Sequence, residues 1–344
     1  MTFSLPEGWR PIRSEDAATV AALIDEDEVF AGFRSRLGSQ DVLDMSARTN
    51  LEHDSWLLEE GGHVVAAGGG ERHAGAYFAP GCVHPSAKGR GFGSLLLDFS
   101  EVRAREHAVS TVHQVALGPD DAARRLLESR GYREVRRHYE MTIELDDQPP
   151  EPELPEGLSI ETFREQDAPA WHAATTEALE DLWGFEAMPF EDWWRLRAGD
   201  DHSLWFLVRD GGEIAALARC EAGRRGGGLV GELGVRNPWR RQGLGRALLL
   251  HAFRELRLRG VDRVGLVVDS ANPTGATRLY ESAGMRFEAE HVTFVRNSTD
   301  SRRRGMPLRR LRLHPPHAAL SRPDAQLHHA TGDDHVESAG RGRL

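Results

Sequence analysis

A chain of 344 residues is too long for one domain of ordinary size, so two domains are expected, and a hydrophobic content of 40% is enough to build their cores. The formal net charge of -11 disfavours nucleic acid as the main partner. It favours a cationic acceptor such as an amine, or it simply keeps the chain in solution. Cys82 and Cys220 fit neither a zinc site nor a disulfide framework, so we expect no metal and a reducing, cytoplasmic location.

The first elements predicted along the chain are a strand, a tight glycine turn and a second strand at residues 56–65. The segment before them, residues 1–13, contains acidic and proline residues but no apolar core, so it does not resemble a signal peptide. Gly91 and Gly93 then lead into an apolar helix, and a short helix at residues 123–131 ends in a glycine. No apolar run reaches the roughly 20 residues that a membrane helix needs, so no membrane partner is expected.

The same order of elements returns about 150 residues later, which indicates an internal duplication. Residues 205–214 again read as a strand, a glycine turn and a strand. Gly243 and Gly245 again lead into an apolar helix, and a short helix at residues 276–284 again ends in a glycine. Three matches in one order support a duplicated domain far better than chance.

A segment rich in proline and acidic residues separates the two copies and is predicted to be a linker, because it cannot join the interior of a sheet. The end of the chain is rich in arginine, histidine and proline and lacks apolar periodicity, which predicts a disordered tail. The predicted organisation is an N-terminal domain at residues 1–145, the linker at residues 146–156, a C-terminal domain at residues 157–296 and the tail at residues 297–344.

In the second copy the pattern predicts strands at residues 158–163, 204–208, 213–220, 229–235, 263–268 and 290–295. It predicts helices at residues 167–180, 190–197, 244–259 and 274–283. Because the strand at residues 263–268 is almost continuously apolar, we expect a sheet that is covered on both faces. Most strands come early and one strand–helix–strand unit lies at the centre, so the expected class is mixed α/β.

A candidate anion site lies where the strand ending at Val235 meets the helix that follows Gly245. The first turn of a helix has unpaired N–H groups and the positive end of the dipole, and nearby glycines let a ligand approach the backbone closely. Arg240, Arg241 and Arg246 add positive charge, so the junction suits a diphosphate. A tight turn explains the glycine pair equally well, and the spacing matches neither a Walker A loop nor the dinucleotide fingerprint.

Two motifs of the second copy resemble the GNAT superfamily of acyltransferases. Arg240-x-x-Gly243-x-Gly245 resembles its coenzyme A motif, Gln/Arg-x-x-Gly-x-Gly/Ala. Further along, Asn272, Ala276, Leu279-Tyr280-Glu281 and Gly284 resemble its second signature, in which Met285 replaces a phenylalanine. The resemblance covers the second copy and, more weakly, the first. It implies two tandem GNAT-like domains, each a mostly antiparallel central sheet with a splayed parallel pair and flanking helices.

The resemblance implies that acetyl-CoA is the co-substrate. Its pantetheine arm would fill the gap between the strand that ends at Val235 and the strand at residues 263–268, and its diphosphate would lie on the N–H groups of residues 241–246. The residues implied in cofactor binding are Leu233, Gly234, Val235, Arg240, Arg241, Gln242, Gly243, Leu244, Gly245, Arg246 and Asn272, with Val83, Gly91 and Gly93 in the first copy.

Two residues are candidates for proton transfer. Tyr280 matches the general acid of the family, which would protonate the departing CoA thiolate, although a core tyrosine would also suit its helix. Glu232, on the strand before the glycine loop, is the candidate general base, and a solvent-facing strand residue is the alternative. In the first copy Leu127 stands in place of Tyr280, and Pro119 in place of Asn272. We therefore expect the N-terminal domain to be catalytically inactive, as a scaffold or a vestigial CoA binder.

Aromatic residues crowd the early helices of the second copy, which in this fold commonly wall the acceptor pocket. They are Trp171, Trp183, Phe185, Phe190, Trp193 and Trp194. The segment from Asp181 to Phe185 resembles an Asp-His-Trp-Gly-Phe segment of actinobacterial relatives, from which Leu182 departs. Packing in the core or between domains would explain the aromatic residues equally well.

The activity that the resemblance implies is N-acetyl transfer from acetyl-CoA to a primary amine of a small molecule or peptide, by direct attack with Tyr280 as general acid. Among tandem members the chain is loosely similar to mycothiol synthase, so one alternative is acetylation of a cysteinyl pseudo-disaccharide. Another alternative is a non-catalytic CoA-binding regulatory module. The oligomeric state does not follow from the sequence.

Overall fold

The structure, a computed structural model, describes residues 5–34 and 36–297, and these residues belong to one compact unit. The predicted tail lies outside the described residues except for Asn297. The strands of the N-terminal copy are β1 (Trp9–Arg10), β2 (Ser55–Glu60), β3 (His63–Gly69), β4 (Glu71–His73), β5 (Ala76–Phe78), β6 (Gly81–Val83), β7 (Thr111–Leu117) and β8 (Arg133–Glu144). Its helices are α1 (Ala17–Phe30), α2 (Ser39–Met45), α3 (Leu51–Asp54), α4 (Phe92–Glu106) and α5 (Asp121–Ser129).

The C-terminal copy contains the elements predicted from the sequence, with small shifts at their ends. Its strands are β9 (Ser159–Thr162), β10 (Trp205–Asp210), β11 (Glu213–Arg224), β12 (Gly227–Val235), β13 (Arg263–Asp269) and β14 (Arg286–Asn297). Its helices are α6 (Ala168–Leu179), α7 (Phe190–Arg197), α8 (Leu244–Leu258) and α9 (Ala276–Ser282). A 3-10 turn, η5 (Asn237–Trp239), precedes the glycine loop.

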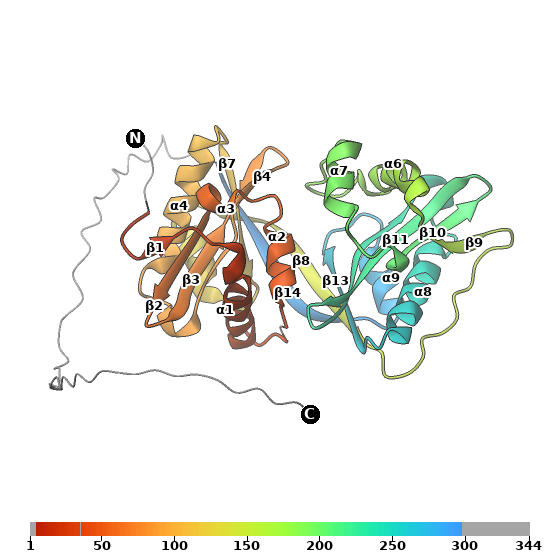
Figure 1. The fold of residues 1–344 in the computed structure, drawn as a ribbon, viewed down its shortest axis with the longest axis horizontal. Coiled ribbons are helices and arrows are strands. Elements are labelled where there is room, and N and C mark those ends of the chain that lie inside the picture. The colour runs from red at the N-terminus through yellow and green to blue at the C-terminus, as the bar shows by residue number, and fades with distance from the viewer. Residues whose placement is uncertain (1–4, 35, 298–344) are drawn as a thin grey trace, which may run out of the picture. The chain divides into compact units, whose positions relative to one another are not determined.

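The strands form two sheets, which confirm the mixed α/β class. A four-stranded sheet has the order β1-β2-β3-β6, and a ten-stranded sheet has the order β4-β5-β7-β14-β8-β13-β12-β11-β10-β9 (Figure 1). Most neighbouring strands are antiparallel, whereas β5 with β7 and β12 with β13 are parallel pairs. Each copy therefore places one parallel pair within an otherwise antiparallel arrangement.

The last strand of each copy lies in the sheet of the other copy. β8 pairs with β13 along the whole of β13, and β14 pairs with β7 along the whole of β7. The two exchanged strands also pair with each other, and they run side by side in yellow and blue in Figure 1. Since paired strands satisfy each other's backbone N–H and C=O groups, each copy completes its hydrogen-bonded sheet with a strand of the other.

Cleavage of the linker is expected to leave the two copies associated, because the exchanged strands hold them together. A protease site introduced between Asp147 and Glu153 would place the cut in a segment that belongs to no strand or helix. Size-exclusion chromatography should then show one species at the mass of the intact protein, while a denaturing gel shows two fragments. The parent protein treated with the same protease is the control. Elution of two separate folded fragments would contradict the exchange.

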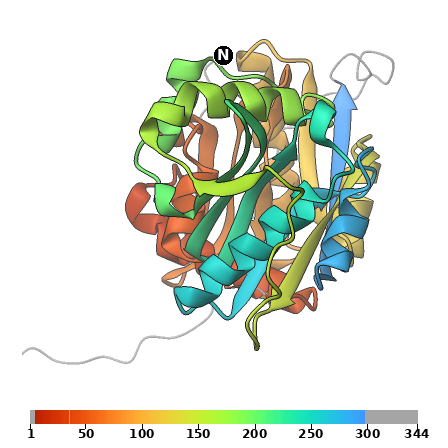
Figure 2. The ribbon, with the colours of Figure 1, turned by 90° about the vertical axis from the view of Figure 1, so that its right-hand side faces the viewer.

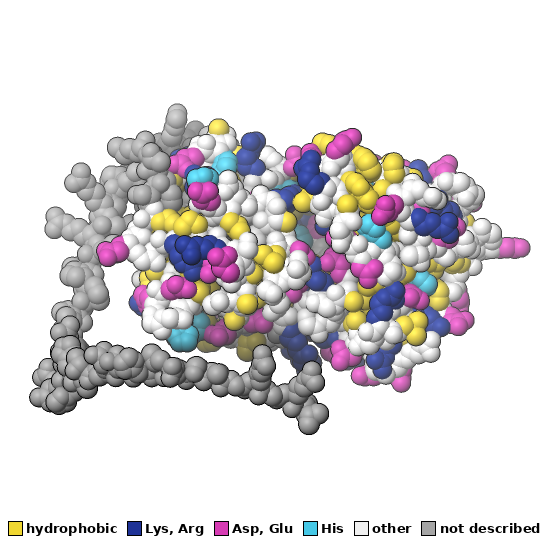
Figure 3. All heavy atoms as spheres, in the orientation of Figure 1, with side chains coloured by type: hydrophobic (Ala, Val, Ile, Leu, Met, Phe, Trp, Pro, Cys, Tyr) yellow, Lys and Arg dark blue, Asp and Glu magenta, His cyan; other side chains and the backbone are white. Residues whose placement is uncertain are grey.

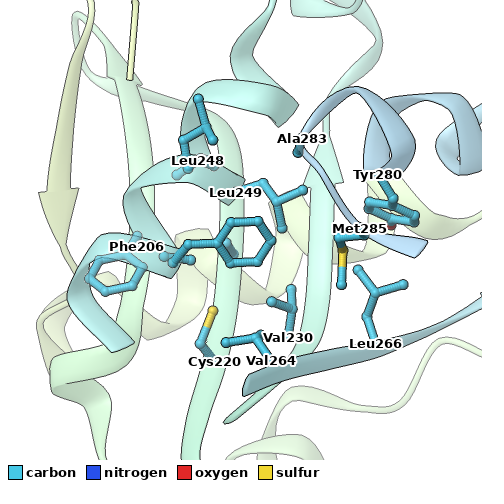
Figure 4. Close-up of a cluster of buried hydrophobic side chains, with 14 of the residues drawn as sticks. Phe206, Cys220, Val230, Leu248, Leu249, Val264, Leu266, Tyr280, Ala283 and Met285 are labelled. Atoms are coloured by element: carbon cyan, nitrogen blue, oxygen red, sulfur yellow. The ribbon is translucent and has the colours of Figure 1, made fainter. Parts of the chain in front are cut away.

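Helices cover the two faces of β10 and β11 with different cores (Figure 2). On one face lies α8, whose side chains Leu248 and Leu249 pack with Phe206, Val230 and Val264 (Figure 4). On the other face lie α6 and α7, and the buried residues of their cluster are Phe163, Ala168, Trp171, Ala174, Trp193, Trp205, Leu207, Ile214 and Leu217. None of the helices in the described part of the chain is long and apolar enough to cross a membrane.

β13 is covered on one face only, so the prediction that this strand is covered on both faces was wrong. Val264, Leu266 and Val268 belong to the core beneath α8, whereas Val267, which points to the opposite face, is 51% exposed. The reason is that α6 and α7 pack over β10 and β11, and their buried cluster includes no residue of β13. The apolar run thus marks a strand with one open face in the middle of a large sheet.

Candidate active site

The parallel strands β12 and β13 part soon after they meet. Only two residue pairs join the two strands, Gly228 with Val264 and Leu229 with Gly265. From Val230 to its end, β12 keeps its partner β11 but has no partner on the side of β13. The predicted cofactor residues Leu233, Gly234 and Val235 lie on this free edge. Such an edge offers N–H and C=O groups to an extended ligand that is added like a strand.

A β-bulge lies where the free edge of β12 begins. Arg219 of β11 stands opposite Glu232, and Cys220 stands opposite Val230, so Gly231 is the extra residue. A Cβ atom at Gly231 would lie 2.5 Å from Nη2 of Arg219, so a larger residue would have to displace this guanidinium from its position beside Glu232. The bulge therefore sets the orientation of the residues that follow it, including the candidate base.

The mouth of α8 presents a row of free backbone donors. Among the described residues, the N–H groups of residues 241–246 donate to no protein acceptor. The loop turns into the helix through left-handed backbone at Arg241 (φ 65°) and Gly243 (φ 84°). A Cβ atom at Gly245 would lie 3.1 Å from Cδ2 of Leu279, so the second glycine lets α9 pack closely against α8. Free N–H groups at the positive end of a helix suit an anionic ligand.

The polar side chains of the glycine loop differ in whether they are bound within the protein or exposed. Arg240 is bound within the protein, where Nε donates to the carbonyl oxygen of Val235 at 3.0 Å and Nη2 donates to that of Ala178 at 3.2 Å. Gln242 donates from Nε2 to the carbonyl oxygen of Pro238 at 3.4 Å. Arg241 and Arg246 are exposed and form no ion pair with the described residues. These two arginines are therefore the loop cations left for a ligand, whereas Arg240 holds the loop in place.

Reversal of both free charges, in the variant Arg241→Glu with Arg246→Glu, is expected to raise the KM for acetyl-CoA about tenfold or more and to change kcat little. The reason is that two cations near a diphosphate become two anions while the chemistry is left intact. Steady-state kinetics at two salt concentrations measure the effect, which should shrink at high salt. Arg164→Glu, at another exposed arginine, is the control. An unchanged KM would place the diphosphate elsewhere.

Tyr280 lies on α9 beside the core. Its side chain is buried near Leu266 and Met285 (Figure 4), and burial raises its pKa to about 12. The hydroxyl forms no hydrogen bond with any described residue. Asn272 shapes the turn before this helix, because its Oδ1 accepts from the backbone N–H of Thr274 at 2.9 Å. The structure thus holds a protonated phenol with an uncommitted hydroxyl close to the split strands.

Glu232 points to the face of the sheet opposite α8. One carboxylate oxygen, Oε1, accepts a hydrogen bond from Nε of the buried Arg219 at 3.0 Å, and the other, Oε2, is buried without a protein partner among the described residues. The Arg219 partner was not predicted, because it depends on the register across the bulge. One oxygen is therefore fixed, and the other is available to a water molecule or a substrate.

The corresponding site of the N-terminal copy has lost these features. Nζ of Lys88, in its glycine loop, is held by Asp27 and by Asp120 at 2.7 Å each. Leu127, in the position of Tyr280, is buried. Val83 lies opposite Ala66 in the N-terminal copy as Val235 lies opposite Ala216 in the C-terminal copy, so the two valines are equivalent. The residue three positions before the valine is Glu232 in the C-terminal copy and Pro80 in the N-terminal copy. Sequence reasoning missed this proline, although counting back from each glycine pair would have found it. Gly91 caps α4 in left-handed backbone (φ 93°), so only the backbone turn remains.

Comparison with known proteins identifies the family. The model of the Acetyltransferase (GNAT) family matches residues 20–132 and residues 163–285, one region in each copy and together more than half of the chain. The protein belongs to the GNAT family. The predicted family, the fold class with its two GNAT-like regions and the assignment as an acyltransferase are thereby confirmed.

Relatives of this GNAT protein cover most of its length. It is 36% identical over 211 residues to a mycothiol acetyltransferase of Thermobispora bispora, and the matched region covers 59% of this chain and 70% of that relative. It is 30% identical over 303 residues to a mycothiol acetyltransferase of Geodermatophilus obscurus, and the matched region covers 83% of this chain and 92% of that relative. Both relatives are acetyltransferases by name, and the second spans both copies of the present chain.

Solved structures support the same tandem GNAT fold. A GCN5-related N-acetyltransferase from Sphaerobacter thermophilus superposes with a TM-score of 0.74 at 31% identity, covering 86% of this chain and 97% of that one. A tandem GNAT protein from the clavulanic acid biosynthesis pathway superposes with a TM-score of 0.62 at 19% identity, covering 84% and 98%. At that identity the second structure bears on the fold alone.

Proposed function

We propose that this GNAT protein transfers an acetyl group from acetyl-CoA to the primary amine of a small molecule or peptide, with the chemistry in the C-terminal copy. One observation carries the proposal. The free edge of β12 leads to the open donors at the mouth of α8; Glu232 lies on β12 itself, and Tyr280 lies on the neighbouring helix α9. The edge fits a pantetheine arm, and residues 241–246 fit a diphosphate.

Acetyl-CoA would supply an activated acyl group as a thioester. A backbone N–H group of residues 233–235 on the free edge stabilises the negative charge that develops on its carbonyl oxygen. Oε2 of Glu232 takes a proton from the attacking amine, directly or through water, while Arg219 keeps the carboxylate in place. Tyr280 keeps its proton because burial raises its pKa to about 12, and it gives that proton to the departing thiolate.

A second candidate is the mycothiol synthase type of reaction, in which the acceptor is a cysteinyl pseudo-disaccharide. It is favoured by the names of the relatives from Thermobispora bispora and Geodermatophilus obscurus, which are both mycothiol acetyltransferases. This candidate uses the same groups for the chemistry and differs only in the acceptor. It is therefore a special case of amine acetylation and is tested in the same assay.

We propose a cytoplasmic location, no nucleic-acid partner and no metal, on the grounds of charge and cysteine usage. Both cysteines are free thiols, and burial raises their pKa, to about 12 for Cys220. Thiols that stay protonated, one of them partly buried and the other buried, suit a reducing compartment. The acidic net charge of the chain is compatible with a cationic acceptor.

The test is acetyl transfer by the purified protein to a panel of acceptors: simple amines, short peptides and the cysteinyl glucosaminyl-inositol. Because the last acceptor carries its own thiol, the acetylated product should be detected by mass spectrometry rather than by thiol release alone. Acetylation of at least one amine, with formation of CoA, is expected. If no amine is acetylated while acetyl-CoA still raises the melting temperature, the protein only binds the cofactor and the proposal is overturned.

A further inference from the structure

The turn of the hairpin between β11 and β12, residues 224–227, docks on the N-terminal copy, and we call it the hairpin tip. Its two central residues, Arg225 and Gly226, both have left-handed backbone (φ 49° and 68°), as a tight hairpin turn requires. The backbone N–H of Arg225 donates to Oδ2 of Asp41, on α2 of the N-terminal copy, at 3.2 Å. A Cβ atom at Gly226 would lie 2.6 Å from Cβ of Arg36. The tip therefore fits closely against the N-terminal copy.

An unbroken row of ion pairs runs from this contact to the candidate base. Nε of Arg224 donates to Oδ1 of Asp41 at 2.7 Å, and its Nη1 donates to Oε2 of Glu221 at 2.6 Å. Nη1 of Arg219 donates to Oε1 of Glu221, and its Nε donates to Oε1 of Glu232 at 3.0 Å. Acidic and basic side chains alternate along these five residues, which we call the ion-pair row. Each of its charged groups contacts the next.

The ion-pair row is shielded from water over its whole length. None of its side chains is more than 23% exposed, and those of Asp41 and Arg219 are only 5% and 8% exposed. Buried charges interact strongly, and a group that loses its partner there finds no water to replace it. The loss of one pair is therefore expected to disturb the neighbouring pairs, which exposed ion pairs would not do.

Two further ion pairs join the hairpin tip to the N-terminal copy. Asp44, also on α2, accepts from Nη1 of Arg224 and so holds the same guanidinium as the ion-pair row. Arg225 donates from Nη1 to Oε2 of Glu140 on β8, and this pair leads away from the candidate base. The surface between α2 and α7 is hollowed, and charged side chains lie around the hollow (Figure 3). The tip thus carries two neighbouring arginines that both bind the N-terminal copy, and only Arg224 belongs to the ion-pair row.

We propose that Asp41 of the N-terminal copy positions the candidate base Glu232 of the C-terminal copy through the ion-pair row. The inference rests on the proposed acetyl transfer, in which Glu232 takes the proton of the amine. When Arg224 is lost, Glu221 loses one of its two partners and reorients, and Arg219 then no longer holds the carboxylate of Glu232 in place. A reacting group displaced by about 1 Å can lose about hundredfold in rate. The N-terminal copy thus contributes to the reaction without a reacting group of its own.

The experiment combines Arg224→Met with Glu232→Gln in a double-mutant cycle, with acetyl-CoA and the acceptor of the panel that is acetylated fastest. In the otherwise wild-type protein, Arg224→Met should lower kcat about fivefold or more and leave the KM for acetyl-CoA within about twofold. In the Glu232→Gln background it should change the residual kcat less than about twofold, because no base is left to position. A loss of stability alone would lower the rate in both backgrounds.

A second variant covers the case in which Arg224→Met does not fold. Asp41→Asn removes the charge at the far end of the ion-pair row but keeps an oxygen that can accept from the backbone N–H groups of Gly38 and Arg225. It should show the same pattern, a lower kcat in the otherwise wild-type protein and no further loss beside Glu232→Gln. All rates are measured below the melting temperature of every variant.

Arg225→Met is the matched control, because it breaks a neighbouring pair between the hairpin tip and the N-terminal copy. It should lower the melting temperature about as much as Arg224→Met and leave kcat within about twofold. Equal losses of kcat in both backgrounds, an equal loss in Arg225→Met, or an unchanged kcat in an active Arg224→Met protein would overturn the inference alone, since the pairs would then only fasten the copies together. A wild-type protein that acetylates no acceptor of the panel would instead overturn the proposed function, and this inference with it.

Discussion

Replacement of Tyr280 by phenylalanine is expected to lower kcat about hundredfold or more and to leave the KM for acetyl-CoA nearly unchanged. The phenol is the proton donor for the departing thiolate, and the variant removes the proton but keeps the ring in the core. Since the hydroxyl has no hydrogen-bond partner among the described residues, its removal leaves no buried group unpaired, and the melting temperature should not fall. Steady-state kinetics and a thermal melt measure the two effects.

Two further measurements separate proton donation from a packing role for Tyr280. Tyr132→Phe, at a buried tyrosine of the N-terminal copy, should leave kcat unchanged. In the wild-type enzyme the raised pKa of about 12 keeps Tyr280 protonated, so kcat should show no descending limb below about pH 11 from this group. A Tyr280→Phe variant with wild-type kcat, or one that loses activity only because it unfolds, would remove the tyrosine from the mechanism.

Local pattern was enough to predict nearly every element of the C-terminal copy and the duplication itself. It could not predict the strand exchange. β8 and β14 are equivalent strands of the two copies, so their alternation of apolar and polar residues fits either sheet. The residues of β8 and β14 therefore do not decide which of the two sheets each strand joins. That depends on how the two copies are connected in one chain. For a related reason the open face of β13 was missed, because a short apolar run does not record which helices lie above it.

The candidate site was predictable wherever a backbone shape demands a residue type. Gly243 and Gly245 stand where a left-handed turn and a close helix contact favour glycine, so the turn into the helix could be predicted, while its role in binding the cofactor stays a prediction. The partners of its side chains were not predictable. Arg240 turns inward to the end of β12, and Arg219 reaches Glu232 across a bulge that adds one residue to the register. Such contacts depend on how strands are paired, which the spacing along one strand does not reveal.

Replacement of Glu232 by glutamine is expected to lower kcat about hundredfold at neutral pH, because the carboxylate that takes the amine proton is lost. Glutamine has the same size, and its amide oxygen can still accept the hydrogen bond from Nε of Arg219, so the fold should be kept. The deficit should shrink as the pH rises toward about 10, where more of the amine is already deprotonated in solution. A pH profile of kcat for the wild type and the variant measures both effects.

The control for Glu232→Gln is Glu191→Gln on α7, an exposed carboxylate that should change neither kcat nor the pH profile. The Kd for acetyl-CoA should be the same in all three proteins, because Glu232 points away from the helix mouth that carries the free donors. A deficit that stays constant from neutral to alkaline pH would mean that Glu232 positions the acceptor and does not accept its proton. A variant with full activity at neutral pH would leave proton removal to solvent and would show that the buried free oxygen of Glu232 has no part in the reaction.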